Sequence, residues 1–273
     1  MQQMQEQFAA HAMPRIALGL EYDGTDFVGW QSQPSGRSVQ DTLAGAVSFV
    51  ADETVTVHGS GRTDAGVHAL QQVAHFDARV ERTPRQWLLG INSKLPPDVA
   101  VRWVHAVAHD FDARRSALRR RYRYTILQQV ARPALLRARA WWLREPLDCA
   151  AMTAAAAGWL GEHDFSAFRA ASCQAKSPMR RLIAVEIGER RRAGSTVVTL
   201  EFTANAFLHH MVRNFVGTLA AVGSGELAAE EAVAILERRD RTAAGVTAPA
   251  AGLALVEAVY PEHFGLPRYV DDL

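Results

Sequence analysis

Hydrophobic and polar positions alternate with a period of two in several segments of the first part of the chain. Four apolar side chains of RIALGLEY (15–22) would share one face of a strand, because polar or small residues separate them. The β-branched run TVTVH and the segment LQQVAHFDA have the same character. The pattern predicts strands at 15–22, 54–58, 70–78 and 99–107.

Two segments between these strands carry helical signals instead. Over 38–51, Val39, Leu43 and Val47 recur every four residues, and Ser38 followed by Asp41 gives a capping-box pattern at the start. The segment 83–95 opens on Thr-Pro-Arg-Gln, which is typical of a helix with proline at its first position. The order of the first half is therefore strand, helix, strand, strand, helix, strand.

The second half predicts the same order with one helix added. An alanine-rich helix is expected over 147–162, ended by Gly161. Another is expected over 207–223, with a shorter one near 228–238. Strands are predicted at 121–129, 180–190, 195–204 and 252–260.

A βαββαβ order is that of the ferredoxin-like unit, which is also the plan of the common RNA-recognition module. We therefore predict an α+β fold of two ferredoxin-like halves whose antiparallel sheets join beside a central cleft. The halves would span 14–111 and 112–265, with a polar extension at 1–13 and a tail at 266–273. A ligand is expected in the groove where the halves meet.

Composition narrows the class of protein. The chain has 273 residues, of which 48% are hydrophobic and 22% charged, so it is expected to be globular. The polar first residues do not resemble a signal peptide, and no apolar run is long enough to span a bilayer. Cys149 and Cys173 are too few for a disulfide framework. These features favour a cytoplasmic protein without a membrane partner.

Charge is unevenly distributed although the net charge is only +1. Between Ala113 and Arg144 there are ten arginines and no acidic residue. The overall excess of arginine over lysine is explained by nucleotide-composition bias, but bias does not explain the clustering. Guanidinium groups pair with phosphate oxygens in a bidentate way, so this segment is a candidate phosphate-binding surface.

The segment HGSGRTDAGVHALQQVAHF (58–76) surrounds one aspartate, Asp64, with glycines and nearby histidines. A metal site of Asp64 with His58, His68 and His75 would lack a second carboxylate, and no H-E-x-x-H pattern exists. A phosphate loop is rejected because its lysine is absent and a strand follows. A plain turn is the interpretation that composition alone favours.

The fourth interpretation is a catalytic carboxylate. Glycines would let the backbone bend sharply and let a bulky substrate approach Asp64. Arg62, two residues before it, would favour the ionised carboxylate.

The motif GSGRTDAGVHA resembles the active-site motif of the tRNA pseudouridine synthase A family. Further segments resemble family segments in the family's order, and the resemblance covers roughly residues 15 to 265. They are YDGTDFVGWQSQP, LPPDVAVRWV, FDARRSALRRRYRYTI, EHDFSAFR, NAFLHHMVRNFVGTL and GLALVEAVYP. The family's fold, two ferredoxin-like halves around a basic cleft, agrees with the periodicity.

The resemblance implies an isomerase that converts uridine to pseudouridine at tRNA positions 38, 39 and 40 in the anticodon stem-loop. It also implies a homodimer that works without cofactor or metal. Asp64 would be the catalytic residue, acting as nucleophile at C1′ or C6 or as base at the 2′ position. The residues expected to bind substrate are Tyr122, which would stack on the flipped base, Arg62, Arg213 and Leu253. Arg213 would also be the basic partner of Asp64 across the cleft. Weaker candidates for the RNA backbone are Arg119, Arg120 and Arg121.

Two other classes of function stay open on the residues alone. A non-catalytic RNA-binding protein could keep the cleft, and a metal-dependent hydrolase could use Asp64 with nearby histidines. His209 and His210 resemble a metal pair, but adjacent residues of a helix diverge by about 100° and are not expected to share an ion.

Overall fold

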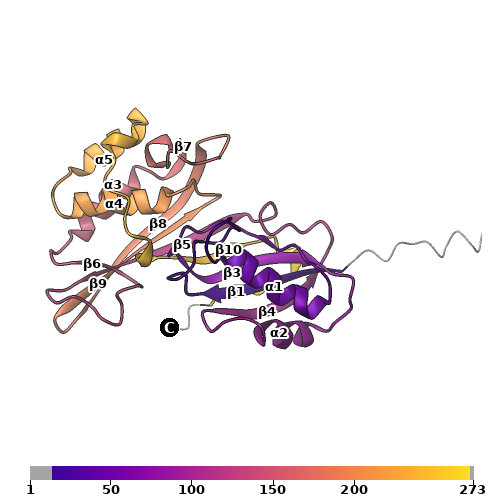
Figure 1. Cartoon of the computed structure of the whole chain (residues 1–273). Helices are drawn as coiled ribbons and strands as arrows, with labels where there is room; N and C mark the ends of the chain where they lie inside the picture. Colours follow the sequence, from indigo (N-terminus) through magenta and orange to yellow (C-terminus); the bar gives the residue numbers. More distant parts are fainter. Residues whose placement is uncertain (1–13, 271–273) are drawn as a thin grey trace, which may run out of the picture.

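The computed structural model describes residues 14–270, so the predicted polar extension at 1–13 lies outside the described residues. Within them, a ten-stranded, mostly antiparallel sheet is combined with five α-helices (Figure 1). The prediction of an α+β fold with joined sheets is confirmed at this level. No helix of the described part is both long and apolar enough to cross a bilayer.

The first half follows the predicted element order. Its elements are β1 (Arg15–Tyr22), α1 (Val39–Ala51), β2 (His58–Gly59), β3 (His68–Asp77), α2 (Pro84–Asn92) and β4 (Val99–Val107).

Both helix starts are capped as the sequence indicates. The hydroxyl of Ser38 accepts a hydrogen bond from the backbone N–H of Asp41 at 3.0 Å, and Thr83 with Gln86 forms a reciprocal capping box before Pro84. Such caps satisfy N–H groups that the first turn of a helix cannot pair.

The predicted strand at 54–58 is largely wrong, because only His58 and Gly59 pair, with His75 and Ala74 of β3. Val55 and Val57 are buried in the core, yet their backbone groups bond to side chains of α1. The N–H of Val55 donates to Ser48 Oγ, and the carbonyl of Val57 accepts from Gln40 Nε2, each at 2.9 Å. A β-branched run can therefore be buried without a strand partner.

The second half contains two short strands that the sequence pattern did not predict, β6 and β7. Its elements are β5 (Arg119–Gln128), β6 (Trp141–Leu143), α3 (Cys149–Ala157), β7 (Gly161–Asp164), β8 (Met179–Arg192), β9 (Ser195–Ala204), α4 (Met211–Gly223), α5 (Ala229–Arg238) and β10 (Leu253–Val259).

Two predicted helix boundaries are wrong. The helix expected over 147–162 ends at Ala157 with Gly158 as its C-cap, and Gly161, at φ 102°, begins β7 instead of ending the helix. The helix expected over 207–223 begins only at Met211. This later start changes the geometry of the candidate site, as described below.

The strand order is β4-β1-β3-β10-β5-β9-β8-β7, with β2 added beside β3 and β6 beside β5. β10, the last strand along the chain, lies in the middle of this order. It is parallel to β3 and antiparallel to β5, and so joins the strands of the first half to those of the second.

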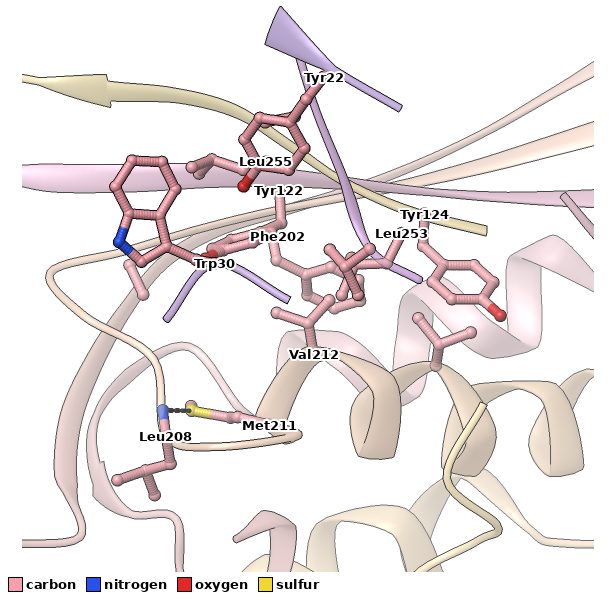
Figure 2. Packing of buried hydrophobic residues seen from close by; sticks show 14 of the residues in the cluster. Tyr22, Trp30, Tyr122, Tyr124, Phe202, Leu208, Met211, Val212, Leu253 and Leu255 are labelled. Carbon is pink, nitrogen blue, oxygen red and sulfur yellow. Dashed lines mark hydrogen bonds between the residues drawn. The ribbon is translucent and has the colours of Figure 1, made fainter. Parts of the chain in front are cut away.

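One face of the sheet carries the main core. Register partners on successive strands form a buried row across the centre of the molecule: Tyr22, Ala69, Leu255, Tyr122 and Phe202. Figure 2 labels all of these residues except Ala69. All five helices contribute buried side chains to the same cluster. The cleft described below is built on this face.

A smaller core lies on the opposite face of the first half. Phe111, Tyr260 and Phe264 pack together there over Ala17 and Val73. The Tyr260 hydroxyl donates to the carbonyl of Ala113 at 2.6 Å. The segment after β10 is thereby fastened to the first half.

Candidate active site

The loop that carries Asp64 is held between the segment after β1 and the strand β5. An isolated bridge pairs Asp64 with Gly29, and the N–H of Trp30 donates to the carbonyl of Thr63 at 3.0 Å. The Thr63 and Tyr22 hydroxyls share a buried hydrogen bond of 2.8 Å. These contacts fix the backbone on both sides of the carboxylate.

Glycine is required where two backbones meet at this loop. A Cβ at Gly24 would lie 1.9 Å from the carbonyl oxygen of Val67, and one at Gly29, whose φ is 112°, would lie 2.5 Å from that of Thr63. In contrast, Gly61 borders the cleft, and the nearest atom to an added Cβ would be 3.8 Å away. Some of the glycines therefore serve the packing of the loop, while Gly61 keeps the cleft open.

The side chain of Arg120 supports the loop that carries Asp64. The side chain is buried and donates to three carbonyl oxygens: that of Ser60, from Nε at 3.2 Å and Nη2 at 2.7 Å, that of Arg114 at 2.7 Å and that of Asn205 at 3.0 Å. These four hydrogen bonds give the Arg120 guanidinium a structural role in holding the backbone around it. Its contact with the RNA backbone stays a prediction.

Arg121 has carboxylate partners. Strand alternation turns it away from the cleft, and it pairs with Glu201 at 2.9 Å and Glu257 at 3.1 Å. Two carboxylates neutralise its charge, so it is a poor phosphate ligand. Arg119, at the exposed start of β5, is the member of this trio that keeps an accessible position.

The Asp64 carboxylate contacts three basic side chains from the start of α4. Arg213 Nη1 lies 3.2 Å from Oδ2, and Arg213 Nε donates to the carbonyl of Ala248 at 2.7 Å. His209 Nε2 lies 3.2 Å from Oδ1, and His210 Nε2 lies 3.4 Å from Oδ2. The structure thus brings Asp64 and Arg213 together, as the resemblance implied. It also places two histidines against the carboxylate, which the resemblance did not imply.

The expectation that His209 and His210 diverge around a helix is wrong, because α4 begins after them. His210 is the N-cap, with a left-handed backbone at φ 62°, and this turn brings the ring centroids to 4.1 Å. The Ser172 hydroxyl lies 3.2 Å from His209 Nδ1. Burial lowers the pKa of His210 more than the Asp64 carboxylate raises it.

Tyr122 and Leu253 line the cleft above Asp64. The Tyr122 ring is 7% exposed and packs edge-on against Phe207, with centroids 5.0 Å apart. Burial raises the pKa of its hydroxyl to about 12, so the phenol is neutral over the physiological range. Leu253, 5% exposed, begins β10.

Both halves of the chain contribute to this cleft, which has a volume of about 700 Å³. Arg62 lies at its edge and donates to Gln174 Oε1 of the facing loop at 3.2 Å. The guanidinium in contact with Asp64 is therefore that of Arg213, and not that of the neighbouring Arg62. A second hollow of about 280 Å³ adjoins the first at Gly61 and Arg62 and is lined by Arg114 and Arg115.

The three histidines of the Asp64 segment are part of the scaffold. His68 Nδ1 accepts from the N–H of Gly24 at 3.0 Å while its Nε2 contacts the carbonyl of Ala138 at 2.7 Å. His75 Nδ1 accepts from the N–H of Ala113 at 3.1 Å and its ring stacks on His58. In residues 14–270, the group with metal-ligand spacing is instead Asp64 with His209 and His210.

Sequence reasoning missed four residues of the site: Ser172, Gln174, His209 and His210. The HH pair before Met211 was visible, but its geometry depends on where the helix begins. A left-handed residue at the N-cap carries no clear sequence signal unless it is glycine or asparagine. Ser172 and Gln174 lie in an irregular loop whose position is set by tertiary contacts.

Comparison with known proteins gives a consistent match. A family model described as tRNA pseudouridine synthase matches residues 20–114 and 155–261. Proteins named tRNA pseudouridine synthase A are similar over most of their length. That of Alcanivorax borkumensis is 52% identical over 93% of this chain and 94% of its own, and that of Nitrosococcus oceani is 52% identical over 93% and 96%.

The protein of the same name from Xanthomonas euvesicatoria is 52% identical over 94% of this chain and 99% of its own. Among solved structures, a chain of a Cbf5-Nop10-Gar1 complex covers 88% of this chain at 8% identity, with a TM-score of 0.37. That score is too low to support a statement about the fold.

Proposed function

Because this chain belongs to the tRNA pseudouridine synthase family, we propose that it isomerises uridine to pseudouridine at positions 38, 39 and 40 of the tRNA anticodon stem-loop. The assignment to the isomerase class follows from the family, whereas the target positions and the residue roles below are our proposal. The substrate is tRNA, and the reaction adds no atom and transfers no electron to another molecule.

The observation that carries the proposal is the position of Asp64. Its carboxylate lies in a cleft of about 700 Å³ to which both halves contribute, opposite the neutral phenol of Tyr122 and against the guanidinium of Arg213. A carboxylate can act as nucleophile or base without a cofactor. The proposal assigns Asp64 the initiating step, by attack at C1′ or C6 or by removal of the 2′ proton.

The isomerisation breaks the bond between ribose C1′ and N1 of uracil, and a new bond forms from C1′ to C5. C5 loses its proton and N1 gains one as the base is rejoined, so the product is an isomer of the substrate. Because the phenol of Tyr122 stays protonated, it would serve as a stacking surface and hydrogen-bond donor.

A uridine in a stem must leave the base stack before Asp64 can reach it, which costs a few kcal/mol. Stacking of the flipped base on an aromatic side chain offsets about 1–3 kcal/mol of that cost. We assign this stacking to Tyr122, with Leu253 on the other side of the base. Arg62, at the mouth of the cleft, would occupy the place that the base leaves.

The RNA backbone is assigned to the arginines around the second hollow. Arg115 is highly exposed and approaches Asp112 only at 4.0 Å, and Arg114 borders both hollows. Arg119 joins this group from the exposed end of β5. Together they are preferred over Arg120 and Arg121 as candidate phosphate ligands.

We also propose that the protein is a cytoplasmic homodimer and that its halves, 14–111 and 112–265, are ferredoxin-like units. The order of β1, α1, β2, β3, α2 and β4 is the order such a unit requires. Size measurements on the purified chain test the dimer.

The test of the function uses a uridine-containing tRNA transcript, with pseudouridine mapped after incubation with the protein. We expect product with EDTA present, and no product from Asp64→Asn although the variant still binds the transcript. Asp110→Asn is the matched control, because Asp110 is exposed and lines neither hollow. Full activity of Asp64→Asn would overturn the catalytic assignment.

The same experiment separates the other two classes. A non-catalytic RNA-binding protein would bind the transcript and give no pseudouridine with any variant. A metal-dependent hydrolase would cleave its substrate and lose that activity when EDTA is added.

A further inference from the structure

The side chains around Asp64 have the spacing of metal ligands. His209 Nε2 lies 3.2 Å from Oδ1 and His210 Nε2 lies 3.4 Å from Oδ2, and one ligand atom from each of the three residues lies within 4.8 Å of the others. In a tetrahedral site with metal–ligand distances of about 2.0–2.1 Å, neighbouring ligand atoms are about 3.3 Å apart. The two carboxylate–imidazole distances are close to that value, and each imidazole faces a different oxygen of the carboxylate.

The surroundings of the histidines also suit a metal site. A metal-bound imidazole usually has its other nitrogen hydrogen-bonded, which fixes the tautomer and the orientation of the ring. His209 Nδ1 has such a partner in the Ser172 hydroxyl at 3.2 Å. The left-handed backbone of His210 is held by the turn into α4, in which the N–H of Met211 donates to the carbonyl of Leu208 at 3.0 Å.

We propose that Asp64, His209 and His210 form an exchangeable site for a borderline divalent transition-metal ion such as Zn²⁺, and that the bound ion inhibits the enzyme. Two imidazoles and a carboxylate favour such ions, whereas Mg²⁺ prefers oxygen ligands alone. The inhibitory effect rests on the proposed function, because the ion would occupy the catalytic carboxylate. Binding itself does not depend on that function.

Arg213 makes this an exchangeable site. Its Nη1 lies 3.2 Å from Asp64 Oδ2, and its Nε is fixed by the carbonyl of Ala248. A cation bound by the carboxylate would be repelled by this guanidinium, which lowers its affinity. With three protein ligands and a positive neighbour, the ion would bind when the free metal concentration rises and dissociate when it falls.

The ion and the substrate would exclude each other. All three ligand residues line the cleft together with Tyr122 and Leu253, the surfaces that we assign to the flipped uridine. A metal ion on Asp64 would neutralise the charge needed for attack and would stand where the base enters. The site therefore couples the isomerase to the availability of transition metal.

The experiment measures Zn²⁺ binding to the full RNA-free chain by competition with a chromogenic zinc chelator. We expect one ion bound per chain, and affinity at least about tenfold weaker, about 1.4 kcal/mol, in Asp64→Asn, His209→Ala and His210→Ala. His109→Ala is the matched control, because His109 is exposed and belongs neither to the cluster nor to the lining of the cleft, and it should bind as the unchanged chain does.

Arg213→Ala provides a second test, because a loss of structure at the site and a loss of its positive charge would change the Zn²⁺ affinity in opposite directions. Removing the like charge should tighten Zn²⁺ binding, while loss of the site's structure would weaken it. The site is overturned if no stoichiometric ion binds, or if the three ligand variants bind Zn²⁺ with the same affinity as the unchanged chain. Because this arm contains no RNA, its result does not depend on isomerisation.

The inhibitory arm adds Zn²⁺ to the isomerisation assay and then removes it with EDTA. We expect reversible loss of pseudouridine formation by the unchanged chain and by His109→Ala. Isomerisation that continues with the site saturated overturns the inhibitory role, even if the binding arm succeeds.

Discussion

At the scale of single residues, neighbours decide what a side chain can do. Arg120 and Arg213 are both arginines that border the cleft, yet one donates only to backbone carbonyls and the other contacts Asp64. Sequence identified Asp64 and the arginine opposite it. It could not separate Arg120 from its neighbours, because strand alternation and tertiary contacts, which no short motif encodes, determine the difference.

Tyr122 allows a prediction about pH. Burial raises the pKa of its hydroxyl to about 12, two units above the ordinary 10, so this group should not titrate between about pH 8 and 10. The rate of pseudouridine formation by the unchanged chain and by Tyr122→Phe should therefore follow parallel pH profiles in that range. An inflection near pH 9–10 that disappears in the variant would contradict the neutral role assigned to the phenol.

His75 allows a prediction about stability. Burial, followed by the charge of Arg15, lowers its pKa from 6.5 to about 4, and its Nδ1 accepts from the N–H of Ala113. Below pH 6.5 the imidazole of His75 becomes protonated in the unfolded chain but stays largely neutral in the folded chain until the pH approaches 4. This residue should therefore destabilise the fold as pH falls from 6.5 towards 4, by about 2–3 kcal/mol in total.

Urea unfolding at about pH 7, 5.5 and 4.5 measures the effect. The free energy of unfolding of His75→Gln should fall less steeply over this range than that of the unchanged chain. His263→Gln, which changes an exposed histidine that does not contribute to the pKa shift of His75, is the control and should keep the original slope. Identical slopes for the unchanged chain and His75→Gln would remove His75 from the explanation.

At the scale of elements, α4 connects packing to the site. Inside it, Gly217 allows the segment 245–248 to approach so closely that a Cβ would lie 1.7 Å from the carbonyl oxygen of Val246. The same segment holds Arg213 through the carbonyl of Ala248. Gly217 lowers the helix propensity of α4, but the close approach that it allows is required to hold the guanidinium of Arg213 against Asp64.

Two glycine-to-alanine changes test this link. Gly217→Ala should destabilise the fold by about 1–3 kcal/mol, the usual cost of overpacking, and should lower the rate of isomerisation because Arg213 is displaced. Gly45→Ala, inside α1, would meet nothing within 4 Å, and should stabilise the fold by about 0.5–1 kcal/mol without affecting the rate. Thermal unfolding and the tRNA assay measure both, and a harmless Gly217→Ala would contradict the close approach.

Element prediction succeeded where the pattern is local and failed where partners lie far away. The caps at Ser38 and Thr83 and the strand over 99–107 depend on neighbouring residues, and the structure confirms them. The start of α4 depends on Leu208 and Met211 packing into the core. The four-residue error at that boundary hid the two histidines that contact Asp64.

At the scale of the whole molecule, the halves share one sheet and one main core. β10 lies between β3 and β5, and the buried row from Tyr22 to Phe202 crosses from one half to the other. The sequence predicted joined sheets but gave no strand order, because pairing between distant strands leaves no periodic signal.

Leu255 lies in the middle of that row and is fully buried. Leu255→Ala should lower the free energy of unfolding by about 2–5 kcal/mol, the range for a large cavity in a core. Far-UV circular dichroism and tryptophan fluorescence should report one coincident transition for both the unchanged chain and the variant. Two separate transitions in the unchanged chain would show that the halves fold independently.

The central place of β10 has a consequence for biosynthesis. A ribosome delivers β3 and β5 long before β10, so during translation the two halves lack the strand that lies between them. The wall that carries Leu253 cannot be completed until that strand has been released. A nascent chain should therefore acquire the cleft around Asp64 only at the end of its synthesis, which would keep partially made molecules from capturing tRNA.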